Sequence, residues 1–334
     1  METPAGGLPA DGGTVSAAGE DAVLARILPR LASGRAALLG PGDDAAVVAA
    51  ADGRFVVTSD LMVHGPDFRL AWSRPFELGW KAAATNLTDV AAMGARPTAL
   101  VVALALPPEL PVAAAEGIAD GLRAALDALA PGCGVVGGDL SASSALTIAV
   151  TAFGDLEGRA PVLRSGARPG DVVAHAGVLG DAARGLALLF AEGVDEHGEP
   201  DAGRAEALRQ RHPELLAAQL APSPPVSAGV DAAVAGASAM LDVSDGLARD
   251  AARIARASGV RIDFDGAALG DDLALVLGGA EDHGLLATFP PGAGLPAAFR
   301  PIGRVVAGEG LAVDGVAVGA EGWDPYAGWD GGRG

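Results

Sequence analysis

Aspartates recur in this sequence beside glycines and at the ends of predicted strands. A site for several Mg²⁺ ions needs acids from separate strands and loops, because each Mg²⁺ binds one or two carboxylates, waters and substrate phosphates. One candidate ligand lies in a glycine loop, one at a strand end, one on a helix, one after a glycine pair and two around a strand-to-helix turn: Asp44, Asp60, Asp89, Asp139, Asp242 and Asp245.

Each of these acids also has an ordinary structural explanation. Ser244 and Asp245 suit helix N-caps, and Asp89 suits a solvated helix face. The run Gly137-Gly138-Asp139 suits a turn after a strand. A purely structural role for the whole set is disfavoured, because structure alone does not call for so many acids at glycine turns.

The loop GPGDDAAVV at residues 40–48 also matches the dinucleotide pattern G-x-G-x-x-A. The residues after it predict an extended run and a turn, not the helix whose N-terminus would hold a pyrophosphate, and its two acids would repel a bare phosphate. A P-loop is excluded because Lys81 is the only lysine and no G-x-x-x-x-G-K surrounds it. If this chain handles phosphates, metal ions must do what lysine does elsewhere.

Composition limits the partners. The 334 residues are 50% apolar and 19% charged, which predicts a globular chain with one large or two medium domains. A formal net charge of −19 argues against nucleic-acid and anionic-membrane partners. The single cysteine, Cys133, excludes an internal disulfide, and the N-terminus lacks the basic and apolar regions of a secretory signal. We therefore expect a cytoplasmic protein.

Periodicity and turn signals predict two α/β halves. Residues 1–18 lack periodicity and are expected to be a loose N-terminal extension. The first half, residues 19–158, predicts helices at 75–94 and 111–130 and strands at 97–107 and 145–156. The second half, residues 159–334, begins with the punctuated segment EGRAPVLRSGARPGD and repeats a strand, glycine turn and helix at 171–190 and 239–260.

A set of short sequence words, occurring in order over roughly residues 20–325, resembles the thiamine-monophosphate kinase family, in the superfamily of aminoimidazole ribonucleotide synthetase and selenophosphate synthetase. The words are GPGDDAAVV, VTSDLMV, KAAATNLTDVAAMGARP, GGDLSASSALTIAVTAFG, RSGARPGD, GDAARGL, APSPPV, LDVSDGL and GAEDHGLLATFP. As a set they are highly specific.

The resemblance implies a two-domain α/β fold. An N-terminal Mg-ATP-binding domain pairs its sheet across a homodimer interface, and a C-terminal α/β sandwich domain ends in a segment that contacts substrate. It also implies the reaction: ATP phosphorylates thiamine monophosphate to thiamine diphosphate by direct in-line transfer assisted by several Mg²⁺ ions.

The resemblance also implies roles for individual residues. The Mg²⁺-binding positions are Asp44, Thr58, Ser59, Asp60, Asp89, Asp139, Asp242 and Asp245, among which Asp60 and Asp89 are the predicted catalytic pair. The nucleotide contacts are Gly138, Asp139, Arg164 and Ser244. The substrate contacts are Asp67, Glu281 and Trp323, with Trp323 expected to stack on the thiamine rings.

The chain departs from the family pattern mainly around the acceptor. Asp67 stands where the family usually has a histidine, Ala280 replaces a glycine, and Pro325-Tyr326 replace His-Phe. Leu140 follows the glycine-glycine-aspartate word where a threonine is common.

Two alternatives therefore stay open: a same-superfamily enzyme acting on another phosphorylated small molecule, and a catalytically weak Mg-ATP-binding paralogue. Selenophosphate synthesis and hydrogenase maturation are disfavoured, because the N-terminal glycine-rich region and the C-terminal tail contain no cysteine.

Overall fold

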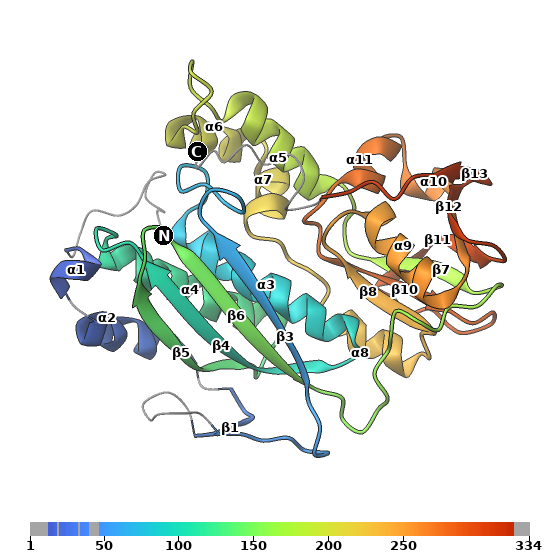
Figure 1. Ribbon diagram of the computed structural model, residues 1–334, viewed down its shortest axis with the longest axis horizontal. Helices are drawn as coiled ribbons and strands as arrows, with labels where there is room; N and C mark the ends of the chain where they lie inside the picture. Colours follow the sequence, from blue (N-terminus) through green and yellow to red (C-terminus); the bar gives the residue numbers. More distant parts are fainter. Residues whose placement is uncertain (1–12, 19, 33, 40–46, 324–334) are drawn as a thin grey trace.

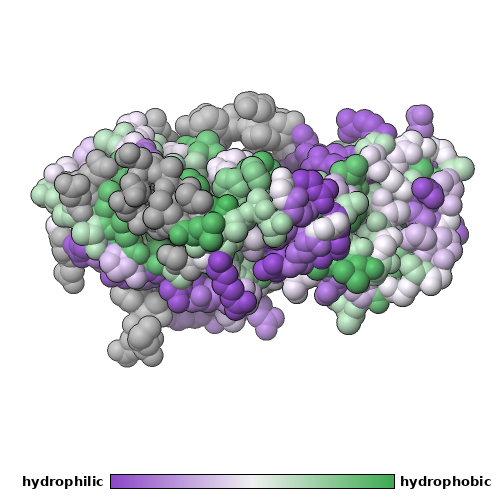
Figure 2. Space-filling view, turned by 90° about the horizontal axis from the view of Figure 1, so that it is seen from below, coloured by the Kyte–Doolittle hydropathy of each residue, from purple (hydrophilic) through white to green (hydrophobic). Residues whose placement is uncertain are grey.

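The computed structural model describes residues 13–18, 20–32, 34–39 and 47–323. Its two main sheets come from the two halves of the chain, and residues 156–171 connect them (Figure 1). Seen from below, hydrophobic residues group over the N-terminal half and hydrophilic residues gather toward the middle of the molecule (Figure 2). The predictions for Asp44 and Pro325-Tyr326, and residues 1–12 of the predicted extension, lie outside the described residues.

The first half forms a four-stranded sheet of order β3-β6-β4-β5, in which only β4 and β5 are parallel. Two long helices, α3 and α4, cover one face of this sheet (Figure 1). A separate pair, β1 and β2, forms a two-stranded sheet. The elements are α1 (Val15–Ala18), α2 (Glu20–Ile27), the 3-10 helix η1 (Leu28–Arg30), β1 (Ala37–Leu39), β2 (Val47–Val48), β3 (Val56–Val63), α3 (Pro75–Ala92), β4 (Arg96–Leu106), α4 (Val112–Leu129), β5 (Gly134–Ala142) and β6 (Thr147–Asp155).

The second half forms a seven-stranded sheet of order β13-β12-β9-β11-β7-β10-β8, in which only β12 and β9 pair in parallel. One face packs against α9, and the other packs against α3 and α8. The elements are β7 (Val172–Ala176), α5 (Asp181–Glu192), α6 (Ala202–Arg211), α7 (Pro213–Leu220), α8 (Ser227–Val234), β8 (Ala239–Val243), α9 (Leu247–Ser258), β9 (Arg261–Phe264), α10 (Gly266–Leu269), α11 (Leu273–Gly278), β10 (Gly284–Phe289), β11 (Phe299–Val306), β12 (Gly310–Val313) and β13 (Val316–Val318).

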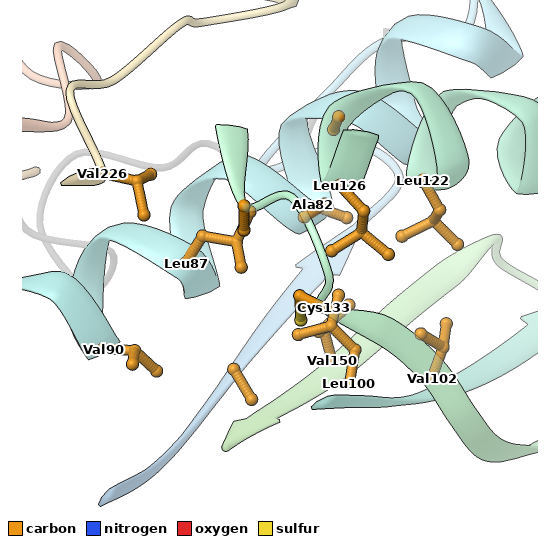
Figure 3. Packing of buried hydrophobic residues seen from close by; sticks show 14 of the residues in the cluster. Ala82, Leu87, Val90, Leu100, Val102, Leu122, Leu126, Cys133, Val150 and Val226 are labelled. Carbon is orange, nitrogen blue, oxygen red and sulfur yellow. The ribbon is translucent and has the colours of Figure 1, made fainter. Parts of the chain in front are cut away.

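Helix α3 lies between the two sheets. It contacts β3, β6 and α4 within its own half, and β8, β10 and α8 of the other half. Thirteen of its 18 residues are buried, as expected for a helix with neighbours on all sides. Figure 3 shows side chains of α3 and α4 packed over the first sheet: Ala82, Leu87, Val90, Leu122 and Leu126 above Leu100, Val102 and Val150.

Helices α5, α6 and α7 form a further group beside the sheets, around the buried ring of Trp72. The Nε1 atom of Trp72 donates to the carbonyl oxygen of Gly193 at 2.8 Å, and Nε1 of Trp80 donates to that of Pro222 at 2.6 Å. Both tryptophans therefore connect the first half of the chain to the second. No helix within the described residues is long and apolar enough to cross a membrane.

Alternation along the strands gives the first sheet a covered face and an open face. Leu100, Val102 and Leu104 of β4 point to the covered face and are buried. On β3, Val57 and Leu61 point to the open face and are 53% and 58% exposed. The open face is thus partly apolar in a single chain.

Most of the predicted elements are present, but two predicted positions are wrong. Asp60 lies in the middle of β3, not at its end. Asp139 lies inside β5, and the glycines before it do not form a turn. A Cβ on Gly138 would lie only 1.9 Å from the carbonyl oxygen of Val102, so this glycine allows close approach of β5 to β4.

The crossing of α3 and α4 depends on two reciprocal glycines. A Cβ on Gly79 would lie 1.9 Å from the Ile118 carbonyl oxygen, and a Cβ on Gly121 would lie 1.9 Å from that of Phe76. Since both neighbours are backbone atoms, neither can rotate away. The position of α3, and of every side chain it carries, is therefore set by backbone contact at this crossing.

We predict that Gly121→Ala lowers the free energy of unfolding by about 2 kcal/mol or more, because the added methyl group forces α3 and α4 apart. Gly278→Ala is the matched control, since a Cβ there meets no atom within 4 Å. Urea unfolding followed by circular dichroism measures both variants. Equal midpoints for Gly121→Ala and the unmodified chain would contradict the packing argument.

Candidate active site

Three aspartates from three elements lie within electrostatic reach of one another where the two sheets join. Asp60 points to the covered face of β3, Asp89 lies near the C-terminal end of α3, and Asp242 lies on β8, an edge strand of the second sheet. Two side chains hold the first pair. Thr58 Oγ1 donates to Asp89 Oδ2 at 2.8 Å, and Asn86 Oδ1 accepts from the backbone N–H of Asp60 at 3.1 Å.

The electrostatics of this acidic cluster, Asp60, Asp89 and Asp242, are those of like charges held together. Burial, followed by the charges of Asp242 and Asp60, raises the pKa of Asp89 to about 7. Loss of surrounding water and the nearby Asp242 likewise raise the pKa of Asp60. The cluster thus holds more negative charge than its own surroundings compensate, which favours binding of a cation.

Asp245 follows Asp242 in the turn between β8 and α9. Asp250, a fully buried acid on α9, accepts the backbone N–H groups of Ser244 and Asp245 at 3.0 and 2.9 Å. Arg253 contacts both Asp245 and Asp250, the former at 2.5 Å. The N-cap of α9 is Gly246, so the alternative role of Ser244 and Asp245 as N-caps is not adopted.

These acids suit Mg²⁺ better than a metal held by protein alone. Among the described residues, no group of three or more histidine, cysteine or acidic side chains is placed to hold an ion by itself. Mg²⁺ commonly takes one or two carboxylates and completes its shell with waters and substrate phosphates. Carboxylates contributed by both halves of the chain suit such an ion when it arrives with a phosphorylated ligand.

A cavity of about 150 Å³ has Glu281 in its wall, and Glu281 lies within electrostatic reach of Asp60 in the cluster. It brings together the three predicted substrate residues, Asp67, Glu281 and Trp323, from distant parts of the chain. Its other walls are aromatic, aliphatic and polar: Gly65, Pro66, Phe68, Arg69, Trp72, Ser73, Lys81, Leu186, Leu189, Phe190, Gln219, Leu220 and Ala280. An apolar pocket with a few convergent polar groups is typical of a small-molecule site.

The pocket residues are fixed by local contacts. Asp67 Oδ2 accepts the backbone N–H of Val63 at 2.7 Å, which closes the turn after β3, and burial raises the pKa of Asp67. Trp323 is 41% exposed, and its backbone N–H donates to the carbonyl oxygen of Asp245 at 2.8 Å. The same turn that carries Asp245 therefore anchors the segment that carries Trp323.

The segment Glu281-Asp282-His283 joins the pocket to the acidic cluster. Asp282 accepts the backbone N–H groups of Gly180 and Ala182 at the start of α5. Against the effect of burial, Lys81 and then His283 hold the pKa of Glu281 well below its usual range. Glu281 in turn raises the pKa of the buried His283, although burial opposes this.

Several predicted site residues lie apart from this arrangement. Ser59 points to the open face of the sheet, where its hydroxyl contacts Val150 O and Thr151 Oγ1 at 3.1 Å. Asp139 also faces the open side, because it pairs with Ala103, and it lies on the opposite edge strand from Asp60. Arg164 is exposed in the connection between the halves. One chain alone does not bring Asp139 to the acidic cluster.

Four residues of the site were not among those predicted: Asn86, Lys81, Asp250 and His283. Asn86 and Lys81 lie in the word KAAATNLTDV, at positions where a polar residue interrupts an otherwise apolar helix. Buried polar groups in such a helix need partners, and that signal was available in the sequence. Asp250 and His283 gave no comparable signal, because the sequence does not show that tertiary packing buries both side chains beside the site.

Comparison of the whole sequence with known proteins identifies its family. Residues 42–156 match the family described as AIR synthase related protein, N-terminal domain. The thiamine-monophosphate kinase of Mycobacterium tuberculosis strain H37Rv is 44% identical over 344 residues, covering 98% of this chain and 96% of that protein. The thiamine-monophosphate kinase of Aquifex aeolicus strain VF5 is 35% identical, covering 85% of this chain and 92% of that protein.

Solved structures agree with the sequence comparison. The thiamine-monophosphate kinase from Stenotrophomonas maltophilia K279a has a TM-score of 0.73 and 33% identity, covering 89% of this chain and 96% of that one. The structure "AaThiL complexed with AMPPCP and TMP" has a TM-score of 0.67 and 34% identity, covering 84% and 90%. Because the identity extends over nearly the whole chain, this chain belongs to the thiamine-monophosphate kinase family.

Proposed function

We infer that this chain catalyses the ATP-dependent phosphorylation of thiamine monophosphate to thiamine diphosphate. One observation carries the inference beyond family membership: Asp67, Glu281 and Trp323 line one pocket, and Glu281 also lies within electrostatic reach of Asp60. A related protein has been solved with AMPPCP and TMP, so one fold of this kind binds both ligands. The pocket would hold the thiamine end of the acceptor, with its phosphate toward the acids.

The phosphoryl transfer does not require a strong general base. The attacking oxygen belongs to a phosphate that is already ionised near neutral pH. The barrier comes from bringing two polyanions into line, and bound Mg²⁺ ions supply the charge neutralisation that this needs. The chain's own part is to hold those ions through Asp60, Asp89, Asp242 and Asp245, and to fix the acceptor in the pocket. Asp60 and Asp89 are proposed as the central ligands.

The remaining predicted contacts concern the nucleotide. Ser244 and Asp245 lie in a turn whose backbone is held by Asp250, next to the acidic cluster. Gly138 and Asp139 lie on β5, and Arg164 lies in the connection between the halves. We propose that Gly138, Asp139, Arg164 and Ser244 contact ATP, with Asp44 and the backbone around Thr58 and Ser59 adding Mg²⁺ ligands.

Asp139 leads to the proposal of a homodimer. It lies three strands from Asp60, a separation of about 14 Å, and on the other face of the sheet. That open face carries the exposed side chains of Val57 and Leu61. A second copy paired over it would cover this apolar surface and bring its own Asp139 toward a nucleotide bound by the first copy. We therefore propose pairing of the two four-stranded sheets.

The chain departs from the family pattern mainly around the acceptor, so these departures bear on which acceptor is used. Asp67 places a carboxylate, not an imidazole, in the pocket wall. Thiamine carries a cationic thiazolium ring, and a carboxylate beside such a ring is electrostatically favourable. Asp67 is thus compatible with thiamine monophosphate. The same charge would disfavour an acceptor whose only charges are negative, which weighs against another phosphorylated small molecule.

We predict that Asp60→Asn lowers kcat for thiamine diphosphate formation at least ~100-fold, the scale of losing one major electrostatic contact. Asp127→Asn, on the exposed side of α4, is the control and should keep kcat unchanged. Both are measured by chromatography of the product in timed reactions with ATP, Mg²⁺ and thiamine monophosphate. Normal turnover in Asp60→Asn would remove Asp60 from the mechanism.

The dimer proposal has its own test. Leu61→Asp places a charge on the open face and should convert the dimer to a monomer with at least ~10-fold lower activity. Val316→Asp is the control, because Val316 is 70% exposed on β13 at the far edge of the other sheet. Light scattering coupled to size exclusion gives the mass of each variant. A monomeric unmodified chain with full activity would contradict the proposed pairing.

A further inference from the structure

Lys81 is the only lysine of the chain, and it is buried in α3 with 8% of its side chain exposed. An ammonium group away from water is costly unless it is paired and hydrogen-bonded. The roles implied by the family resemblance do not include Lys81. Its contacts therefore need an explanation.

Both polar partners of Lys81 belong to the other half of the chain. Its Nζ atom lies 2.6 Å from Glu281 Oε2, in the segment before β10, and donates to the carbonyl oxygen of Gln219 on α7 at 3.1 Å. All three residues line the same pocket. One ammonium group on the central helix thus fixes two walls of the pocket that come from separate elements.

Glu281 depends on this contact for its orientation. Its backbone has a φ of +75°, a conformation that L-residues other than glycine rarely adopt. Its N–H donates to the carbonyl oxygen of Ser244 at 2.8 Å, which holds the backbone but not the carboxylate. The other basic side chain within 4.0 Å of the carboxylate, among the described residues, is His283, whose Nε2 lies 3.5 Å from Oε2. Lys81 is therefore the closer and stronger partner.

We propose that Lys81 is a positioning residue for the acceptor: it holds the Glu281 carboxylate charged and directed into the thiamine pocket. This inference rests on the proposed function, in which Glu281 contacts the acceptor. It assigns Lys81 no contact with the transferred phosphoryl group. Loss of Lys81 therefore affects recognition of thiamine monophosphate and leaves recognition of ATP largely intact.

The experiment compares steady-state kinetics of four variants with the unmodified chain. Lys81→Met removes the ammonium group, and Lys81→Arg keeps the charge. Glu281→Gln removes the carboxylate, and the double variant Lys81→Met/Glu281→Gln removes both charges together. Arg74→Met is the matched control, because Arg74 joins the start of α3 to Glu206 on α6 by an ion pair but does not line the pocket.

Lys81→Met is expected to raise KM for thiamine monophosphate at least ~10-fold and to change KM for ATP less than ~2-fold. Lys81→Arg should recover part of that loss, and Arg74→Met should alter neither constant. If Lys81 acts through Glu281, the double variant should have the acceptor KM of Glu281→Gln within ~3-fold, because the two effects would not multiply.

Three results would overturn the inference: equal changes in both KM values, no recovery in Lys81→Arg, or multiplied effects in the double variant. If Lys81→Met does not fold, the acceptor KM of the double variant is compared with that of Glu281→Gln. The double variant removes both charges of the pair and therefore leaves neither of them buried without its partner. An unmodified chain that forms no thiamine diphosphate would instead contradict the proposed function. The two failures are therefore distinguishable.

Discussion

Repulsion between carboxylates at the junction of the two sheets is the constraint around which this molecule is arranged. Asp60, Asp89 and Asp242 come from three elements, and burial with mutual repulsion raises the pKa of Asp89 to about 7. A fold tolerates such a cluster only where surrounding packing holds it in place. Here the packing is the buried helix α3 and its glycine contacts with α4. In the proposed function, bound cations offset this cost to stability, and the site accepts phosphates together with their metal ions.

Helix α3 connects the acidic cluster to the rest of the fold. It carries Asp89, it holds Asp60 through Asn86, and it contacts Glu281 in the pocket wall through Lys81. Its neighbours are strands of both sheets, so a shift of the helix would disturb side chains of both halves at once. The pocket and the acidic cluster are therefore two ends of one rigid arrangement, joined by Glu281 and His283. This accounts for a site assembled from residues more than 250 positions apart, from Asp67 to Trp323.

The sequence predicted which residues lie near the junction of the two sheets better than it predicted how each of them is oriented. Strand and helix signals located α3, α4 and the β8–α9 turn, and short words identified the acids and the pocket residues. Periodicity could not show that β3 and β5 continue past Asp60 and Asp139, because glycine pairs mark close strand approach as well as turns. It also could not show that Asp139 faces away from Asp60, which depends on strand order. The polar interruption at Lys81 was visible, but its partners Gln219 and Glu281 were not, because they lie far away in the chain. Asp250 was missed because its burial depends on tertiary packing.

The most direct measurement of the central claim is thermal unfolding of the unmodified chain and Asp89→Asn, each with and without Mg²⁺ and ATP. If like charges are held together for cations, Asp89→Asn without metal should unfold roughly 2 °C higher than the unmodified chain, because it loses a repulsive charge but keeps an acceptor for Thr58. Mg²⁺ with ATP should then stabilise the unmodified chain more than the variant. A lower metal-free Tm for Asp89→Asn, with equal stabilisation of both chains by Mg²⁺ and ATP, would contradict this account.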